Sequence, residues 1–255
     1  MPRSAAVCLF VIACFPALAC ALPVAVSAAP QTLAVRYETV TRKEPRRYDI
    51  SLTYPVFAPL SPVARLANRT VKRYAAESIT AFVRLEAESW REYRKREKPG
   101  DLATGQFVLE LKPVVSLARP DIISLYFNRY SSTGGVHPNT NFAGFTFGSV
   151  SGAAKRLALS DLFTPPANPY TALSQIVVPE LRRRNASWFA GDEPDHKTLS
   201  PATLTDWVTT PAGITLLFAP YQAGSYAEGA YIVKVGFDNL VTVNRSGTLK
   251  PLFAP

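Results

Sequence analysis

The chain has 255 residues and a formal net charge of +9 at pH 7, and 47% of its residues are hydrophobic. This length suits one large domain or two small ones, with enough apolar residues for a real core. All three cysteines lie within the first 20 residues. The rest of the chain therefore excludes disulfides, a thiolate nucleophile and a cysteine-ligated metal site.

The N-terminal segment has the features of a secretory signal. Arg3 precedes an apolar run from Ala5 to Ala21, and small residues that suit cleavage end at Ala19 and at Ala28. The run is short for a membrane span, which needs about 20 apolar residues, and Pro16 interrupts it. We therefore expect an exported protein, periplasmic or secreted, without a membrane span after signal cleavage.

Two alternatives to simple secretion are less favoured. The apolar run could be retained as an N-terminal anchor, although its length argues against this. Cys20 could carry a lipid, but Ala17 stands where a lipoprotein signal usually has leucine.

The positive charge is concentrated in three clusters, at residues 42–47, 91–98 and 182–184. In an exported protein, an anionic envelope polymer such as peptidoglycan, or an acidic protein surface, is a more plausible partner than nucleic acid. The alternative is that these clusters are ordinary solvated faces, which charge runs usually are.

The first third of the chain predicts two strands followed by a long helix. Residues 33–41 and 48–54 alternate between apolar and polar side chains, as half-buried strands do. Pro55 predicts the end of the second strand. Ser61-Pro62 predicts a helix start, and apolar residues then recur every three or four positions toward Arg96. A helix of this length would measure about 50 Å, so we expect its charged end to project, bend or fray.

The remaining elements are mostly strands. They are expected at residues 106–116, 121–130, 141–147, 205–209, 214–218 and 230–237. Pro113 indicates an edge or a bulge in the first of these. A second helix begins near Asn168 and should be bent or shortened by Pro179. The polar stretch 185–201 predicts a mobile loop. This order of elements favours an α+β fold over a doubly wound sheet.

Metal and cofactor chemistry has little support in the sequence. His137 and His196 are the only histidines, and neither has a second ligand-type residue at helical or hairpin spacing. We therefore expect neither a metal nor a cofactor.

Catalytic patterns are equally weak. The chain contains no G-x-S-x-G motif, and serines near His137 would need an orienting carboxylate that only the fold could supply. No sequence motif surrounds the acidic residues that could form a carboxylate pair for glycan cleavage. The acidic residues considered for this role are Asp49, Glu110, Asp161, Glu228 and Asp238.

Binding is the better hypothesis for the aromatic and glycine-rich connections. Gly134-Gly135 permits backbone angles that side chains forbid, and Pro138 holds His137 extended between two predicted strands. Exposed tyrosines suit protein or glycan surfaces. The candidate ligand-binding residues are His137, Asn139, Tyr130, Tyr221, Tyr226 and Glu228. The alternatives are a structural hydrogen-bonding role for His137 and closure of the sheet ends by the tyrosines.

Six short motifs occur in order in the second half of the chain: 134–139, 141–142, 157–163, 209–218, 220–222 and 226–229. This set resembles a domain of unknown function shared by the extracytoplasmic part of the anti-sigma factor RsiV and by the peptidoglycan deacetylase PdaC. Residues 49–84 are similar to the companion domain that precedes it. Together the resemblance covers nearly all of the expected mature chain.

The resemblance implies two small α+β lobes, each a mostly antiparallel sheet with helices packed on one face. After a signal peptide at residues 1–28, we expect the companion lobe at 29–118 and the RsiV-like domain at 119–255. RsiV-like domains sense lysozyme by binding it, but lysozyme is basic and this basic chain would repel it.

We expect the chain to lack the membrane span of such a sensor and the catalytic domain of the deacetylase. The resemblance thus favours a non-catalytic envelope module that recognises a wall polymer or a protein partner. Two alternatives stay open: an envelope hydrolase or peptidoglycan-modifying enzyme that uses His137, and a soluble inhibitor of an envelope enzyme.

Overall fold

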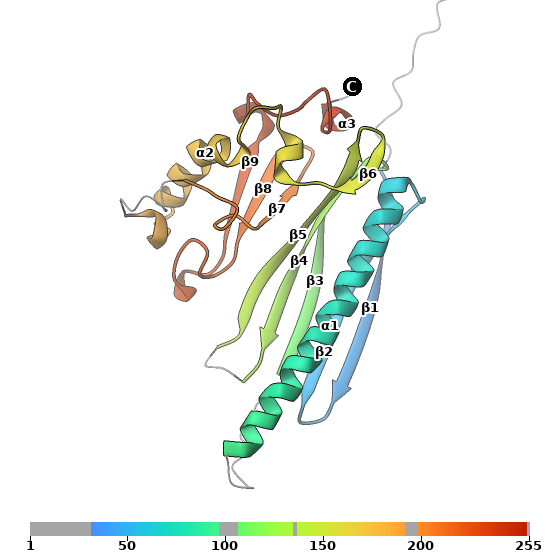
Figure 1. Cartoon of the computed structure of the whole chain (residues 1–255), viewed down its shortest axis with the longest axis vertical. Helices are drawn as coiled ribbons and strands as arrows, with labels where there is room; N and C mark the ends of the chain where they lie inside the picture. The colour runs from blue at the N-terminus through green and yellow to red at the C-terminus, as the bar shows by residue number, and fades with distance from the viewer. Residues whose placement is uncertain (1–31, 97–106, 135–136, 192–197, 254–255) are drawn as a thin grey trace, which may run out of the picture.

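The computed structural model describes residues 32–96, 107–134, 137–191 and 198–253. This part of the chain forms two lobes, one around a six-stranded sheet and one around a three-stranded sheet (Figure 1). The predicted α+β class with two lobes is confirmed. The expected signal peptide, Gly135, Val136 and His196 lie outside the described residues. No helix in the described ranges combines the length and apolar character that a membrane span requires.

The large sheet contains six strands in sequence order. They are β1 (Ala34–Glu44), β2 (Tyr48–Ala58), β3 (Phe107–Ala118), β4 (Ile122–Ser132), β5 (Asn139–Val150) and β6 (Ala153–Arg156). All neighbouring pairs are antiparallel except β2 and β3, which are parallel because a helical crossover connects them. The predicted division between residues 118 and 119 falls in the connection between β3 and β4, two paired strands, and stays a prediction.

The crossover is α1 (Pro62–Arg96), which is a single helix of 35 residues as predicted. The hydroxyl of Ser61 accepts a hydrogen bond from the amide of Ala64 at 3.0 Å and so caps its first turn. One face of α1 packs on the sheet through small buried residues such as Ala67, Val71 and Ala75. These side chains let the helix lie close to the strands, and Figure 1 shows its last turns projecting past the sheet.

The prediction that β2 ends at Pro55 is wrong, because the strand continues to Ala58. Strand β2 pairs with β3 only as far as Leu52, so beyond that residue one side of β2 has no strand neighbour. A proline can occupy such an edge without removing a ladder hydrogen bond there. Pro113 of β3 also lies beyond the residues that pair with β2, so one side of β3 is an edge there. A register shift between Val115 and Leu117 follows, and both features agree with the edge or bulge predicted at Pro113.

The small lobe joins a three-stranded antiparallel sheet to a second helix. Its elements are α2 (Pro169–Arg183), β7 (Asp206–Thr209), β8 (Gly213–Phe218), β9 (Tyr231–Gly236) and α3 (Lys250–Phe253). Short 3-10 turns occur at Leu159–Leu162, Ser187–Phe189, Tyr226–Glu228 and Phe237–Asn239. Helix α2 continues past Pro179, so this proline does not end it. The predicted loop after α2 buries Ala186, Phe189 and Leu199 in the core, which ties its described parts to the lobe.

A buried carboxylate fastens the β1–β2 turn to α1. The side chain of Glu86 is 2% exposed and receives two hydrogen bonds from Arg47, at 2.9 and 2.6 Å. Arg47 also contacts Glu44 at 2.8 Å. These hydrogen bonds, above all those to Glu86, raise the pKa of Arg47. The planar fork of the guanidinium thereby neutralises a charge that burial alone would make costly.

Replacing Arg47 by methionine should leave the Glu86 carboxylate buried without its cation. We expect the free energy of unfolding to fall by about 3 kcal/mol, measured by urea denaturation. The control is Arg73→Met on the exposed face of α1, where the ion pair with Glu77 spans 3.7 Å and should contribute less than about 0.5 kcal/mol. Equal losses in the two variants would contradict this account.

Candidate binding site

The two lobes meet where β7 lies against the large sheet, and polar groups hold it there. The hydroxyl of Ser124 on β4 accepts a hydrogen bond from the amide of Thr209 at 2.9 Å. The hydroxyl of Ser116 on β3 donates to the carbonyl of Thr209 at 2.8 Å. The amide of Gly144 on β5 donates to the carboxylate of Asp206 at 2.8 Å. Three strands of one sheet therefore fix both ends of β7.

Gly144 permits this close approach. A Cβ at this position would lie 2.5 Å from the carbonyl oxygen of Trp207, which belongs to the backbone of β7. Arg156 adds a further link, because its guanidinium donates to the carbonyl of Gly144 at 2.8 Å and lies over the ring of Phe145. Burial lowers the pKa of Arg156, while the nearby carboxylate of Asp206 opposes that shift.

The docked lobes bring together three of the predicted binding residues. His137 lies in the β4–β5 connection, and Tyr221 and Tyr226 lie in the β8–β9 connection. The rings of His137 and Tyr226 are stacked with centroids 3.8 Å apart, and the hydroxyl of Tyr226 donates to the carbonyl of Pro138 at 2.9 Å. The hydroxyl of Tyr221 lies 3.3 Å from Nε2 of His137. We call these three residues the aromatic cluster.

The side chain of Gln222 stabilises the turn that carries Tyr221. Tyr221 has φ of 70°, a backbone conformation that side chains other than glycine seldom adopt. The side chain of Gln222 closes the turn, since it accepts from the amide of Ala219 at 2.7 Å and donates to Thr205 at 2.9 Å. The ring of Tyr221, which is 49% exposed, is therefore presented to solvent on a fixed backbone.

Glu228 holds the turn that carries Tyr226. Its carboxylate accepts hydrogen bonds from the amide and hydroxyl of Ser187, the amide of Ser225 and the hydroxyl of Tyr231, all within 3.0 Å. The bonds from Ser187 come first among the causes that hold the pKa of Glu228 well below its usual range. A Cβ on Gly224 would collide with this carboxylate. The described geometry thus assigns Glu228 a positioning contact, and its role as a ligand contact stays a prediction.

Tyr130 and Asn139 lie on β4 and β5, the two strands that the His137 connection joins, and they are on opposite faces of the sheet because Tyr130 pairs with Thr140 and Asn139 with Ser131. Asn139 is the first residue of β5 and is exposed. Tyr130 lines a shallow groove with Val108, Glu110, Lys112, Asn128 and Thr140. Asn128 and Thr140 are not among the binding residues predicted from the sequence. Strand alternation could have indicated both residues. Asn128 lies two residues before Tyr130 on β4 and so shares its face of the sheet, and Thr140 pairs with Tyr130 from β5.

Two family models match the chain. Residues 41–140 match the model described as deacetylase PdaC, and residues 160–238 match a protein of unknown function, DUF3298. The chain is similar to both domains, in this order along the sequence. This confirms the predicted domain combination. His137 lies in the region of the PdaC match, whereas Tyr221 and Tyr226 lie in the region of the DUF3298 match, so the two matched regions each contribute part of the aromatic cluster.

Two solved structures of DUF3298 family proteins have a similar fold. The protein from Bacteroides fragilis has a TM-score of 0.58 at 14% identity, over 88% of this chain and 98% of that one. The protein from Pseudomonas aeruginosa has a TM-score of 0.51 at 15% identity, over 89% of this chain and 99% of that one. At such identities the likeness concerns the fold alone. No curated protein matches the chain.

Four of the acidic residues considered for catalysis each pair with a lysine or an arginine, and Glu110 among them also lines the groove with Tyr130. Asp49 pairs with Lys43, Glu110 with Lys112 and Asp161 with Lys155, while Asp238 lies 3.5 Å from Arg245. In the described ranges, no group of three or more histidine or acidic side chains could hold a metal ion. His137 makes its described hydrogen bonds to a backbone carbonyl and to a tyrosine hydroxyl.

The close contact at Gly144 makes a first prediction for this site. The Gly144→Ala variant should force β7 away from the large sheet and lower the free energy of unfolding by about 2 kcal/mol in urea. Gly191→Ala is the matched control, because a Cβ there meets no atom of the described residues within 4 Å. If the two variants have the same stability, the docking of β7 does not depend on this contact.

The carboxylate of Glu228 predicts a pH dependence. The pKa of a glutamate in the unfolded chain is about 4.3, and the pKa of Glu228 in the folded protein is lower. Its contribution to stability is therefore present above about pH 4.3 and is lost as the pH falls through the folded pKa. We expect Glu228→Gln to melt several degrees below the parent at pH 7, and the difference to shrink toward pH 3. Thermal melts by circular dichroism measure this, and a difference that does not change with pH would contradict it.

Proposed function

We propose that this protein is an exported, non-catalytic binding module of the cell envelope that recognises a wall polymer through the aromatic cluster. The observation that carries the proposal is the convergence of His137, Tyr221 and Tyr226 from the two matched regions, with Tyr221 exposed and the other two rings partly buried. Tyrosine rings offer a large contact area and a hydroxyl at low entropic cost, which suits sugar rings as well as protein surfaces.

The surroundings of His137 favour recognition over catalysis. If Nδ1 donates to the carbonyl of Pro138 at 3.1 Å, then Nε2 accepts from the hydroxyl of Tyr221, and one neutral tautomer satisfies both nitrogens. A general base in a triad needs an orienting carboxylate. The described hydrogen bonds of His137 involve none, and Glu228 is committed to its own turn.

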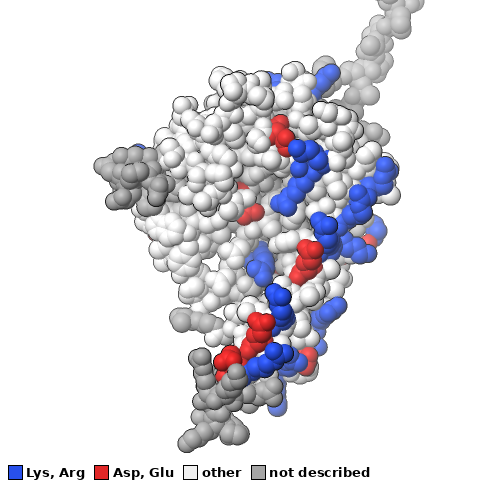
Figure 2. All heavy atoms as spheres, in the orientation of Figure 1, with Lys and Arg blue, Asp and Glu red and all other residues white. Residues whose placement is uncertain are grey.

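The charge distribution supports an anionic partner such as peptidoglycan. Figure 2 shows lysine and arginine side chains gathered along the face of the molecule that α1 occupies, with acidic residues interspersed. Among residues 62–92 of this helix, the exposed basic residues are Arg65, Arg69, Lys72, Arg73, Arg84 and Arg91. Such a surface attracts a polyanion at low salt and releases it as salt screens the charges.

Export belongs to the same proposal. The basic start, the apolar run and the small residues before Ala28 support a cleaved signal. The domain match to a deacetylase model is consistent with a place in the envelope, where a wall polymer is available to bind.

A pull-down on purified cell-wall sacculi tests the proposal with the protein lacking residues 1–28. We expect retention at low salt and a reduction of at least about tenfold in the apparent affinity of Tyr221→Ala, because a central aromatic contact is lost. Tyr37→Ala is the matched control, since Tyr37 is 54% exposed on β1 and outside the aromatic cluster. Absence of retention at low salt, or equal retention of all three proteins, would refute wall binding through this cluster. Binding to a periplasmic protein instead would support the protein-partner alternative.

A further inference from the structure

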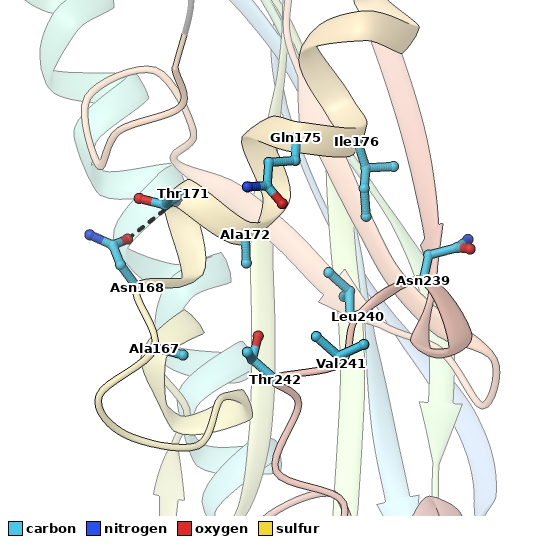
Figure 3. A pocket seen from close by; sticks show the side chains of 10 residues that line it. All are labelled: Ala167, Asn168, Thr171, Ala172, Gln175, Ile176, Asn239, Leu240, Val241 and Thr242. Carbon is cyan, nitrogen blue, oxygen red and sulfur yellow. Dashed lines mark hydrogen bonds between the residues drawn. The ribbon is translucent and has the colours of Figure 1, made fainter.

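A second candidate site lies between α2 and the segment that follows the last 3-10 turn. It has a volume of about 330 Å³ and shares no residue with the aromatic cluster. One wall comes from the start of α2 and the other from residues 239–242 (Figure 3). We call it the α2 pocket. Its lining residues are Ala167, Asn168, Thr171, Ala172, Gln175, Ile176, Asn239, Leu240, Val241 and Thr242.

One buried polar group of the α2 pocket has no partner in the described chain. The hydroxyl oxygen of Thr242 is buried and makes no hydrogen bond. Figure 3 shows this hydroxyl and the carboxamide of Gln175 directed toward the space between the two walls. The hydrogen bond drawn there joins Asn168 to the amide of Thr171, and it caps α2. Buried polar groups are usually satisfied, so an idle one at a pocket points to an absent partner.

The α2 pocket also leaves an aliphatic side chain uncovered. Val241 is 95% exposed, the highest value among the exposed large hydrophobic residues of the described chain. Leu240, Ile176, Ala167 and Ala172 line the same pocket, so its apolar lining is aliphatic. Covering an exposed aliphatic side chain at the rim of a pocket removes apolar surface from water, which favours binding of the ligand.

We propose that the α2 pocket binds an extended, uncharged peptide segment with an aliphatic side chain. The carboxamides of Gln175 and Asn239 each offer both a donor and an acceptor, as a peptide backbone does. None of the ten lining residues is charged, which disfavours an ionic ligand. None is aromatic, so a sugar ring would find no surface on which to stack. The aliphatic residues then receive the side chain of the peptide.

The probe is the blocked tripeptide acetyl-Ala-Leu-Ala-N-methylamide, titrated into the isotope-labelled protein and followed by amide chemical shifts. We expect the shifts to concentrate at residues 167–176 and 239–242. Gln175→Met should weaken the apparent affinity by about threefold to tenfold, since one hydrogen bond is lost. Val241→Asp should weaken it further by placing a charge on the aliphatic rim.

The control is Leu60→Asp, because Leu60 is a 58% exposed aliphatic residue in a loop outside the α2 pocket, and this variant should bind as the parent does. The proposal is overturned if a saturating concentration of tripeptide moves no signal in these two ranges, or if the pocket variants bind as tightly as the parent. Larger shifts at the same residues with N-acetylglucosamine would overturn the assignment to a peptide. Since the probe is not a wall polymer, none of these outcomes depends on the sacculus experiment.

Discussion

The structure depends on the docking of a short strand, β7, against the face of a sheet to which it does not belong. Ser116, Ser124 and Gly144 satisfy the backbone of Thr209 and the carboxylate of Asp206 at the two ends of β7, while the hydroxyl of Thr209 is buried without a partner in the described chain. The two serines and the glycine are small, which brings the two backbones close together. Because the contacts are directional hydrogen bonds rather than apolar packing alone, they fix the register of one lobe on the other.

The position of one lobe on the other determines which connections between strands lie side by side. His137 is held by a connection of the large sheet, and its two tyrosine neighbours are held by a connection of the small one. Glu228 and Gln222 order the second connection by hydrogen bonds within it and to nearby loops. The rings are therefore organised before any ligand arrives, and binding would cost little further conformational entropy. Strain at Tyr221 is consistent with such a role, since strained backbone persists where the surroundings enforce it.

Local patterns predicted most of the elements but not how they meet. Alternation located the strands, and the serine cap followed by Pro62 located α1, because both signals arise within a few neighbouring residues. The β2 end was predicted wrongly at Pro55, since a proline breaks a strand only where both edges are paired, and edge pairing is a property of the sheet. Contacts such as Ser124 with Thr209 join residues 85 positions apart and leave no mark in either local sequence. The proximity of His137 to the tyrosines was a hypothesis that required the structure.

A cluster whose parts belong to two domains has a consequence for its chemistry. Neither the His137 connection nor the tyrosine turn forms the surface alone, so its affinity for any ligand is linked to the stability of the junction between them. Whatever loosens β7 from the large sheet should separate the rings before it unfolds either lobe, because local opening needs less free energy than global unfolding. Conversely, a ligand that spans His137 and Tyr221 binds only the docked arrangement and must stabilise it. The polar junction therefore contributes to the stability of the aromatic cluster, although none of its hydrogen bonds involves a residue of that cluster.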